Sequence, residues 1–423
     1  MFDLIVRNAR LPDDTALMDI AVQNGKIITI GRAMSGETAT EIDAEGHLVT
    51  PPFVDSHCHM DAALTYGQPR VNSSGTLLEG IELWGQLKPT LTIDEIKKRV
   101  LRLCRWSIAR GTLVVRSHVD ISDDQLLAVQ ALIDVREEMK PWLDLQLVAF
   151  PQDGFLRAPS ARQNLLRALD MGVDVIGGIP HFEPTIADGG DSVRQLCEIA
   201  VERGLMVDMH CDESDDPMSR HIETLTSETQ RLGLNGRVTG SHLTSMHSMD
   251  NDYVSGLIPL MAEADIHVIA NPLINITLQG RQDTYPKRRG MTRVKELIEA
   301  GVNVAMGHDN MMDPFYSLGS HDMLDVAHMG LHVAQMTSVR EMNAVFEAVT
   351  TNAARVLNLD GYGLEVGCHA DMVILNCRDP IEALRLRPQR LFVIRRGKII
   401  SRTTRSEPVV SLGSKDEVVS FFM

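Results

Sequence analysis

Residues 49–59 read VTPPFVDSHCH, an apolar run that ends in two histidines separated by one residue. The run has the length and composition of a buried β-strand. Side chains alternate along a strand, so His57 and His59 would share one face and Cys58 would point away. Two imidazoles on one face can bind a transition metal. A single such pair is weak evidence, because two ordinary polar loop residues would look the same.

Seven further apolar runs have the same character. The eight candidate strands lie near residues 50–56, 112–119, 144–150, 173–179, 205–210, 238–242, 266–270 and 302–308. Plausible helices between them include residues 92–110 and 192–203. Strands alternating with helices indicate a parallel sheet, and eight units favour a closed (β/α)₈ TIM-like barrel over an open sheet. Such a barrel needs about 250 residues, so a chain of 423 residues has room for a second module.

Both ends of the chain consist of short strand-like runs broken by glycine turns. They lie at residues 4–6, 19–22, 26–30, 370–375, 391–394 and 398–400. We therefore expect an α/β protein with two parts. Residues 51–357 would form a metal-dependent catalytic barrel, and residues 1–50 plus 358–423 a small β-sandwich domain formed from both termini.

Ionisable residues follow three other predicted strands. His210 ends the fifth strand and precedes Glu213, His242 ends the sixth, and Asp309 follows the eighth. The carboxyl ends of parallel barrel strands meet at one face, where active sites lie. Each residue alone could be a structural polar group, and Glu213 is one of four acids in its loop. Together with the histidine pair, they occupy four strand ends, and this joint pattern indicates a site.

Three histidines and one aspartate form a nitrogen and oxygen donor set suited to one divalent metal ion, Fe²⁺ or Zn²⁺. Glu213 suits a proton shuttle, because a carboxylate in a dry pocket has a raised pKa. Asp309 can bind the ion through one oxygen and accept a proton through the other, and His242 can hold the water or polarise the substrate. We do not expect Cys58 or Cys211, which adjoin predicted ligands, to bind the ion.

Composition excludes several classes of partner. The net charge is −16 and aromatic residues make up 4%, so the surface repels phosphate backbones and offers few base-stacking platforms. No run approaches the roughly 20 apolar residues of a membrane span, and the N-terminus does not read as a signal peptide.

Six scattered cysteines without a CxxC pair fit a reducing compartment. We expect a cytoplasmic protein that binds a small neutral or cationic molecule, without nucleic acid or membrane.

The order His57-x-His59, His210, His242, Asp309 resembles that of the amidohydrolase superfamily, over essentially the whole chain. Longer segments are similar to bacterial cytosine deaminases: FPQDG at 150–154, IPHFE at 179–183, HCDE at 210–213, DTYPKRRG at 283–290 and HMGLH at 328–332. The resemblance implies that one ion is held by His57, His59, His210 and Asp309. Many relatives bridge two ions with a carboxylated lysine after strand four. No lysine stands there in this chain, which implies a mononuclear site.

The same resemblance assigns roles around an aminopyrimidine substrate. Gln152 would hydrogen-bond the ring carbonyl and the adjacent nitrogen, Leu77 would offer backbone contacts, and Phe315 would pack on the ring. Glu213 would protonate the ring nitrogen and shuttle protons, while His242 and Asp309 activate the water. The implied reaction, in a homo-oligomeric enzyme, is hydrolysis of cytosine to uracil and ammonia, a step of pyrimidine salvage.

Two positions depart from the cytosine deaminase pattern. Asn310 stands where those enzymes carry an acidic residue, and Phe315 stands where they carry tryptophan. Relatives that act on triazine rings can carry asparagine at the first position. Deamination of isocytosine, creatinine or an aminotriazine is therefore the alternative. A metal-binding relative without catalysis is a further one, against which the retention of Glu213, His242 and Gln152 speaks.

Overall fold

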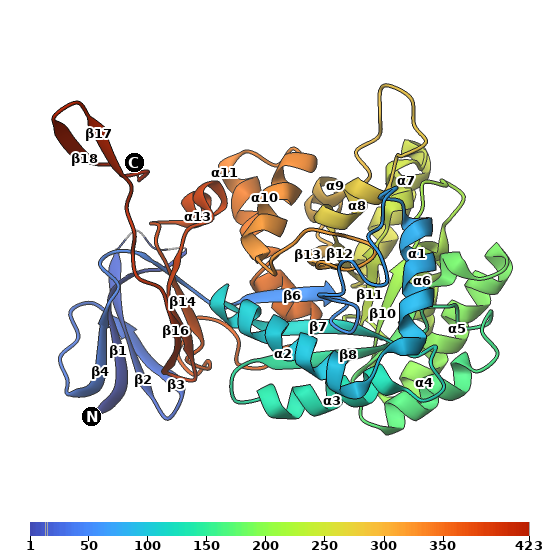
Figure 1. Ribbon diagram of the computed structural model, residues 1–423, viewed down its shortest axis with the longest axis horizontal. Coiled ribbons are helices and arrows are strands. Elements are labelled where there is room, and N and C mark those ends of the chain that lie inside the picture. The colour runs from blue at the N-terminus through green and yellow to red at the C-terminus, as the bar shows by residue number, and fades with distance from the viewer. Residues whose placement is uncertain (13, 15, 423) are drawn as a thin grey trace.

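The computed structural model, which describes residues 1–12, 14 and 16–422, consists of a helix-covered barrel beside a smaller sheet (Figure 1). The barrel strands are parallel and neighbour one another in sequence order. They are β6 (Phe53–Cys58), β7 (Thr112–Asp120), β8 (Asp144–Phe150), β9 (Val175–Gly178), β10 (Met206–Cys211), β11 (Val238–His242), β12 (His267–Ala270) and β13 (Asn303–Met306). Strands covered on both faces read as apolar runs, which is why all eight predicted strands are confirmed.

The first and last barrel strands meet through the residues that follow them. A parallel bridge pairs Cys58 with Asp309. The backbone N–H of Asp309 donates to the carbonyl oxygen of His57 at 2.8 Å, and the N–H of His59 donates to the carbonyl oxygen of Asp309 at 3.1 Å. These bonds complete the predicted TIM-like barrel, and they place the two strand-one histidines beside the aspartate that follows strand eight.

Helices lie outside the barrel and at both of its ends. They are α1 (Leu77–Leu87), η1 (Lys88–Thr90), α2 (Ile93–Ala109), α3 (Leu127–Met139), α4 (Ala161–Asp170), η2 (Pro180–Phe182), α5 (Ile186–Arg203), α6 (His221–Leu232), η3 (Thr244–His247), α7 (Asn251–Glu263), α8 (Pro272–Leu278), α9 (Val294–Glu299), α10 (Met323–Val333), α11 (Val339–Glu347), α12 (Thr351–Val356) and α13 (Pro380–Leu386). The predicted helix at 92–110 is confirmed and begins with a capping box at Thr92.

Helix α5 begins six residues before the predicted start at residue 192. Gly189 and Gly190 are poor helix formers, and the predicted helix began after them. In the structure a Cβ on Gly189 would lie 2.2 Å from Nε2 of His221. Close packing of α5 against α6 therefore requires the glycine, and the Thr185 side chain caps the helix one turn earlier.

The smaller sheet combines strands from both ends of the chain, as predicted. Its order is β16-β15-β14-β5-β1-β2-β3, with β4 paired to β1. The strands are β1 (Phe2–Arg10), β2 (Leu17–Gln23), β3 (Lys26–Gly31), β4 (Thr38–Asp43), β5 (Leu48–Thr50), β14 (Met372–Leu375), β15 (Arg390–Arg395) and β16 (Lys398–Arg402). The sheet curls round an apolar core. The N–H of Ile27 in β3, at one end of the strand order, donates at 3.0 Å to the carbonyl oxygen of Cys368, which precedes β14.

One face of this sheet packs on the barrel. Val373, Leu375 and Val393 belong to the same apolar cluster as the outward-facing residues of the barrel strands. A hairpin of β17 (Val409–Leu412) and β18 (Lys415–Val418) projects from the end of the molecule that holds the terminal sheet (Figure 1).

We propose the boundaries 1–50 plus 358–423 for the small domain and 51–357 for the barrel. Among the described residues, no helix has the length and apolarity that crossing a bilayer requires.

Candidate active site and metal centre

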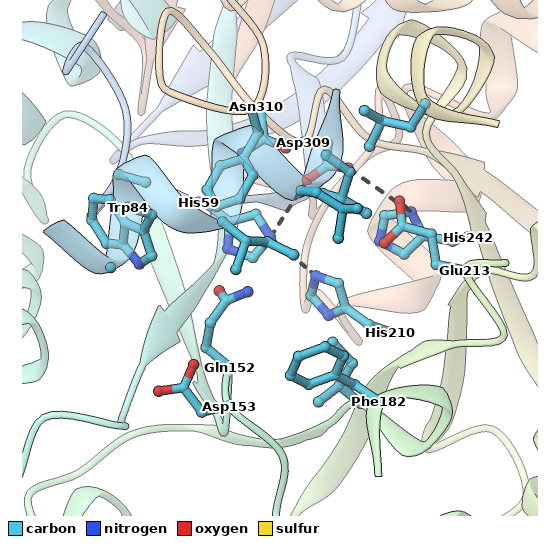
Figure 2. A pocket seen from close by; sticks show the side chains of 18 of the residues that line it. His59, Trp84, Gln152, Asp153, Phe182, His210, Glu213, His242, Asp309 and Asn310 are labelled. Carbon is cyan, nitrogen blue, oxygen red and sulfur yellow. Dashed lines mark hydrogen bonds and ion pairs between the residues drawn. The ribbon is translucent and has the colours of Figure 1, made fainter. Parts of the chain in front are cut away.

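A cavity of about 550 Å³ lies at the carboxyl ends of the barrel strands (Figure 2). It collects nine of the ten side chains that the sequence predicted for the site: His59, Leu77, Gln152, His210, Glu213, His242, Asp309, Asn310 and Phe315. The tenth, His57, is fully buried beneath them. Residues up to 256 positions apart in the chain therefore converge, because the barrel brings its strand ends to one face.

The four predicted metal ligands lie together. Nε2 of His59 is 3.4 Å from Oδ1 of Asp309, and Nε2 of His57 is 3.7 Å from the same oxygen. Nε2 of His210 lies 3.0 Å from Nε2 of His59. All four residues are less than 9% exposed. Strand β6 supplies His57, His59 directly follows that strand, β10 supplies His210, and the turn after β13 supplies the carboxylate.

The chemistry of this cluster fits a divalent ion. Burial, and then the neighbouring imidazoles, lower the pKa of His57 and His210 well below the usual value, and burial lowers the pKa of His59 to about 3. The rings are therefore neutral and carry free lone pairs. Nε2 of His57 is buried and has no hydrogen-bond partner within residues 1–12, 14 and 16–422. Three neutral imidazoles facing one carboxylate form the donor set that Zn²⁺ and Fe²⁺ accept.

A second group of ionisable side chains adjoins the cluster. One ligand atom each of Glu213, His242 and Asp309 lies within 4.8 Å of the others, and Oε1 of Glu213 is 3.3 Å from Nδ1 of His242. Burial raises the pKa of Glu213, which favours the protonated form of this carboxyl. Nδ2 of Asn275 lies 2.9 Å from Nδ1 of His242 and restrains that ring.

Two of these residues have strained backbones. His242 has φ of 72° and Asp309 has φ of 68°, in the left-handed region that disfavours residues with a Cβ. Each such residue costs on the order of 1–3 kcal/mol and persists only where the surroundings impose it. The turns after β11 and β13 thereby direct the side chains of His242 and Asp309 toward Glu213 and the metal cluster (Figure 2).

Helix α1 forms one wall of the cavity. Leu77, Ile81 and Trp84 of this helix line it, and Lys88 follows in η1. Nζ of Lys88 donates to Oδ2 of Asp120 at 2.9 Å, and Nε1 of Trp84 donates to the same oxygen at 3.3 Å. Asp120, the last residue of β7, therefore holds the helix over the mouth. These contacts could not be predicted from the sequence, because they join residues more than 30 positions apart.

Gln152 and Asn310 face the cavity from different sides (Figure 2). Gln152 follows β8, and its amide lies toward the space below His59. Nδ2 of Asn310 donates to Oδ2 of Asp313 at 2.8 Å, and Oδ1 of Asp313 accepts the backbone N–H of Phe315 at 2.9 Å. Asp313 thus positions two predicted substrate contacts, and the sequence had not singled it out.

The inner face of β7 also reaches the site. Arg116, His118 and Asp120 alternate along this strand and are all buried. The rings of His118 and His57 have centroids 4.1 Å apart, and neither nitrogen of His118 has a hydrogen-bond partner among the described residues. The period of two in ionisable residues is the signal that singled out His57 and His59, and it could have found these residues as well.

The two cysteines beside the predicted ligands turn away from the metal cluster. Sγ of Cys58 donates to the carbonyl oxygen of Arg116 at 3.5 Å, and Sγ of Cys211 donates to Oδ2 of Asp212 at 3.5 Å. Both lie in the apolar cluster outside the barrel strands, and burial raises the pKa of both thiols well above the usual value. A neutral thiol is a poor metal ligand.

Comparisons with known proteins agree with this geometry. The chain is 42% identical to 5-methylcytosine deaminase from Klebsiella pneumoniae, solved with 5-fluorocytosine, at a TM-score of 0.93 over 96% of this chain and 98% of that one. It is 31% identical to N-isopropylammelide isopropyl amidohydrolase from Pseudomonas sp. (strain ADP), over 94% of this chain and 97% of that protein. Pterin deaminase from Rhizobium rhizogenes (strain K84 / ATCC BAA-868) is 29% identical over 93% and 90%. A sequence model described as "Amidohydrolase family" matches residues 40–412, and the chain belongs to that family.

Proposed function

We propose that the protein removes the exocyclic amino group of a cytosine ring by hydrolysis, converting cytosine to uracil and ammonia. The observation that carries the proposal is a carboxyl, whose protonated form burial favours, in the same cavity as a metal-capable cluster. Glu213 provides the carboxyl, 3.3 Å from His242. The likeness to 5-methylcytosine deaminase supports the same ring class and makes 5-methylcytosine the first analogue to compare.

The residues divide the reaction between them. A divalent ion bound by His57, His59, His210 and Asp309 would supply a nucleophilic water at neutral pH, by lowering the pKa of that water toward about 7. Glu213 donates its proton to the ring nitrogen beside the reacting carbon, so that negative charge does not accumulate there. Its carboxylate then takes one proton from the attacking water and passes it to the departing amino group, which leaves as ammonia. The second proton of that water returns to Glu213 as the ring carbonyl forms.

The remaining cavity residues hold the ring. The amide of Gln152 offers one donor and one acceptor, which match the adjacent N–H and carbonyl oxygen of cytosine. Phe315, Trp84 and Phe182 provide aromatic surfaces that exclude water from the ring faces. The orientation of the ring toward Glu213 therefore depends on Gln152, and closure of the site depends on α1.

Hydrolysis of an alkylamino group from an aminotriazine is the second candidate. Asn310 favours it, since this residue replaces the acid expected in cytosine deaminases, and so does the 31% identity with N-isopropylammelide isopropyl amidohydrolase. The two candidates share the metal cluster and Glu213, and they differ only in the ring and its leaving amine.

A substrate panel with protein of known metal content tests the proposal. Cytosine, 5-methylcytosine, isocytosine, creatinine and an N-alkyl aminotriazine are each offered to the Zn²⁺-loaded and Fe²⁺-loaded protein, and release of ammonia or amine is measured. We expect the highest kcat/KM with a cytosine ring. Turnover of the triazine alone would establish the second candidate. Failure with every ring, despite bound metal, would refute both.

A further inference from the structure

A chain of hydrogen bonds runs from His57 into the barrel interior. Nδ1 of His57 lies 3.0 Å from Oγ of Ser241, and this hydroxyl donates to Oδ1 of Asp208 at 2.7 Å. The other carboxylate oxygen of Asp208 accepts Nη1 of Arg116 at 2.8 Å. All four residues are 0% exposed. The chain joins four strand residues of β6, β11, β10 and β7 without reaching the cavity.

Arg116 is held in turn at the inner end of this chain. Its Nε donates to Oε1 of Gln146 at 2.7 Å, and Nη2 donates to the carbonyl oxygen of Val356 at 3.1 Å. The guanidinium is therefore fixed by the end of α12 as well as by β8. A guanidinium keeps its charge inside proteins, so its buried partner Asp208 is an ionised carboxylate that can only accept hydrogen bonds.

Counting hydrogens along the chain determines the protonation of His57. Asp208 accepts, so the single hydrogen of the Ser241 hydroxyl points to it. The remaining contact of that hydroxyl is with Nδ1 of His57, and the ring nitrogen must be the donor. A neutral imidazole has one N–H, so the lone pair is on Nε2. That atom lies 3.7 Å from Oδ1 of Asp309 and has no hydrogen-bond partner in the described part of the chain.

We infer that Ser241, Asp208 and Arg116 are positioning residues that hold His57 in the tautomer able to bind metal through Nε2. The inference rests on the metal site of the proposed function and adds the means by which one ligand is prepared for it. Metal-bound histidines commonly donate their second N–H to an oriented acceptor, and loss of that acceptor typically weakens metal binding about 10–100-fold. Here the acceptor is a serine that a buried ion pair orients.

Competition with a chelator measures the effect directly as a Zn²⁺ dissociation constant. Ser241→Ala removes the acceptor and frees the ring to adopt either tautomer, so we expect binding to weaken about 10–100-fold. Ser241→Thr keeps the hydroxyl and should restore most of the affinity. Ser192→Ala is the matched control, because Ser192 is also 0% exposed and donates to a backbone carbonyl remote from the metal cluster.

Asp208→Asn makes a sharper prediction. Its Oδ1 would still accept from Arg116, so its Nδ2 would donate to Oγ of Ser241, and that hydroxyl would turn its hydrogen to Nδ1 of His57. The ring would then carry its proton on Nε2, in the wrong tautomer. Asp208→Asn should bind Zn²⁺ more weakly than Ser241→Ala. Because it also leaves the Arg116 charge unpaired, its folding is checked by circular dichroism.

The outcomes separate this inference from the proposed function. Equal Zn²⁺ affinity in the wild type and Ser241→Ala would overturn the inference and leave the metal site standing. A wild type that binds no Zn²⁺ or Fe²⁺ would refute the metal site itself. Weakening by Ser192→Ala as large as that by Ser241→Ala would show a loss of stability rather than of ligand positioning, and would also overturn the inference.

Discussion

Single side chains divide the chemistry of this site between metal binding and proton transfer. His57 and Glu213 illustrate the two roles: His57 is fully buried, and the side chain of Glu213 is only 12% exposed, 3.3 Å from the uncharged ring of His242. Burial therefore favours the neutral form of each, a free imidazole in one case and a protonated carboxyl in the other. Substitutions at these two positions should affect different measurements.

Glu213→Gln keeps the size of the side chain and removes its exchangeable acid. We expect kcat to fall about 10²–10⁴-fold, with metal content unchanged, because Gln cannot give a proton to the ring nitrogen or take one from water. Steady-state kinetics and metal analysis of one sample measure both. Asp216→Asn is the control, an exposed acid of the same loop. Undiminished kcat in Glu213→Gln would remove this residue from the mechanism.

His57→Ala should instead lose the metal, because it deletes a nitrogen 3.7 Å from Asp309 at the buried side of the cluster. After unbound metal is removed by dialysis, we expect less than one metal ion per chain, measured by atomic emission. His267→Ala provides the comparison, since His267 is a buried barrel histidine that lies outside the candidate metal groups of the described residues. Full metal content in His57→Ala would contradict its role as a ligand.

The loop after β13 carries two of the predicted substrate contacts, Asn310 and Phe315. Asp313 is buried and accepts the Asn310 amide together with the backbone N–H groups of Phe315 and Tyr316. One carboxylate thus orients a polar contact and an aromatic contact of the cavity. Because Asp313 satisfies the amide nitrogen, Asn310 would offer its oxygen to a substrate donor.

Asp313→Ala should release both contacts. Loss of an acceptor for buried donors costs about 1–3 kcal/mol, so we expect KM for the preferred ring to rise about tenfold or more, while metal content is retained. Asp123→Ala is the control, because Asp123 caps backbone N–H groups in another loop of the barrel. An unchanged KM in Asp313→Ala would show that the loop keeps its shape without this carboxylate.

At the scale of the whole molecule, ion pairs of Arg390 and Arg395 join the two parts. Arg390 of β15 is 3% exposed, pairs with Asp322 at the start of α10, and donates through Nε to the carbonyl oxygen of Arg110 at 2.9 Å. Arg395 bridges Asp371 and Asp144, each at 2.7 Å. The terminal sheet therefore braces the barrel from the side away from the cavity (Figure 1).

Arg390→Ala would remove the buried cation beside the Asp322 carboxylate and leave it only the pair with Arg110, 3.2 Å away, whose side chain is 45% exposed. Breaking a buried pair from one side costs about 3–5 kcal/mol, so we expect a clear fall in the free energy of unfolding, measured by urea denaturation. Arg203→Ala removes a pair whose side chains are 40% and 63% exposed, and it should change stability by at most about 1 kcal/mol. Equal effects of the two variants would show that Arg390 does not brace the structure.

Much of this architecture could be predicted from local sequence. Apolar runs separated by amphipathic stretches indicated the barrel, and His57, His59, His210, His242 and Asp309 were found because each stands at a strand end. Strands β4, β17 and β18 were not predicted, since their residues are mostly exposed and show no apolar run. The buried strand β5 was read as the start of β6, because one apolar run covers both. The start of α5 was misplaced, because Gly189 serves a contact with another helix.

The amino-acid order by itself determined which ionisable residues reach the open end of the barrel, since parallel strands all deliver their carboxyl ends to one face. Only the tertiary structure decided how those residues are supported. The serine behind His57 lies 184 positions away, and Asp120 beneath Trp84 lies 36 away. No periodicity encodes such pairs, because they arise from the packing of separate strands and helices rather than from the repeat of any one element.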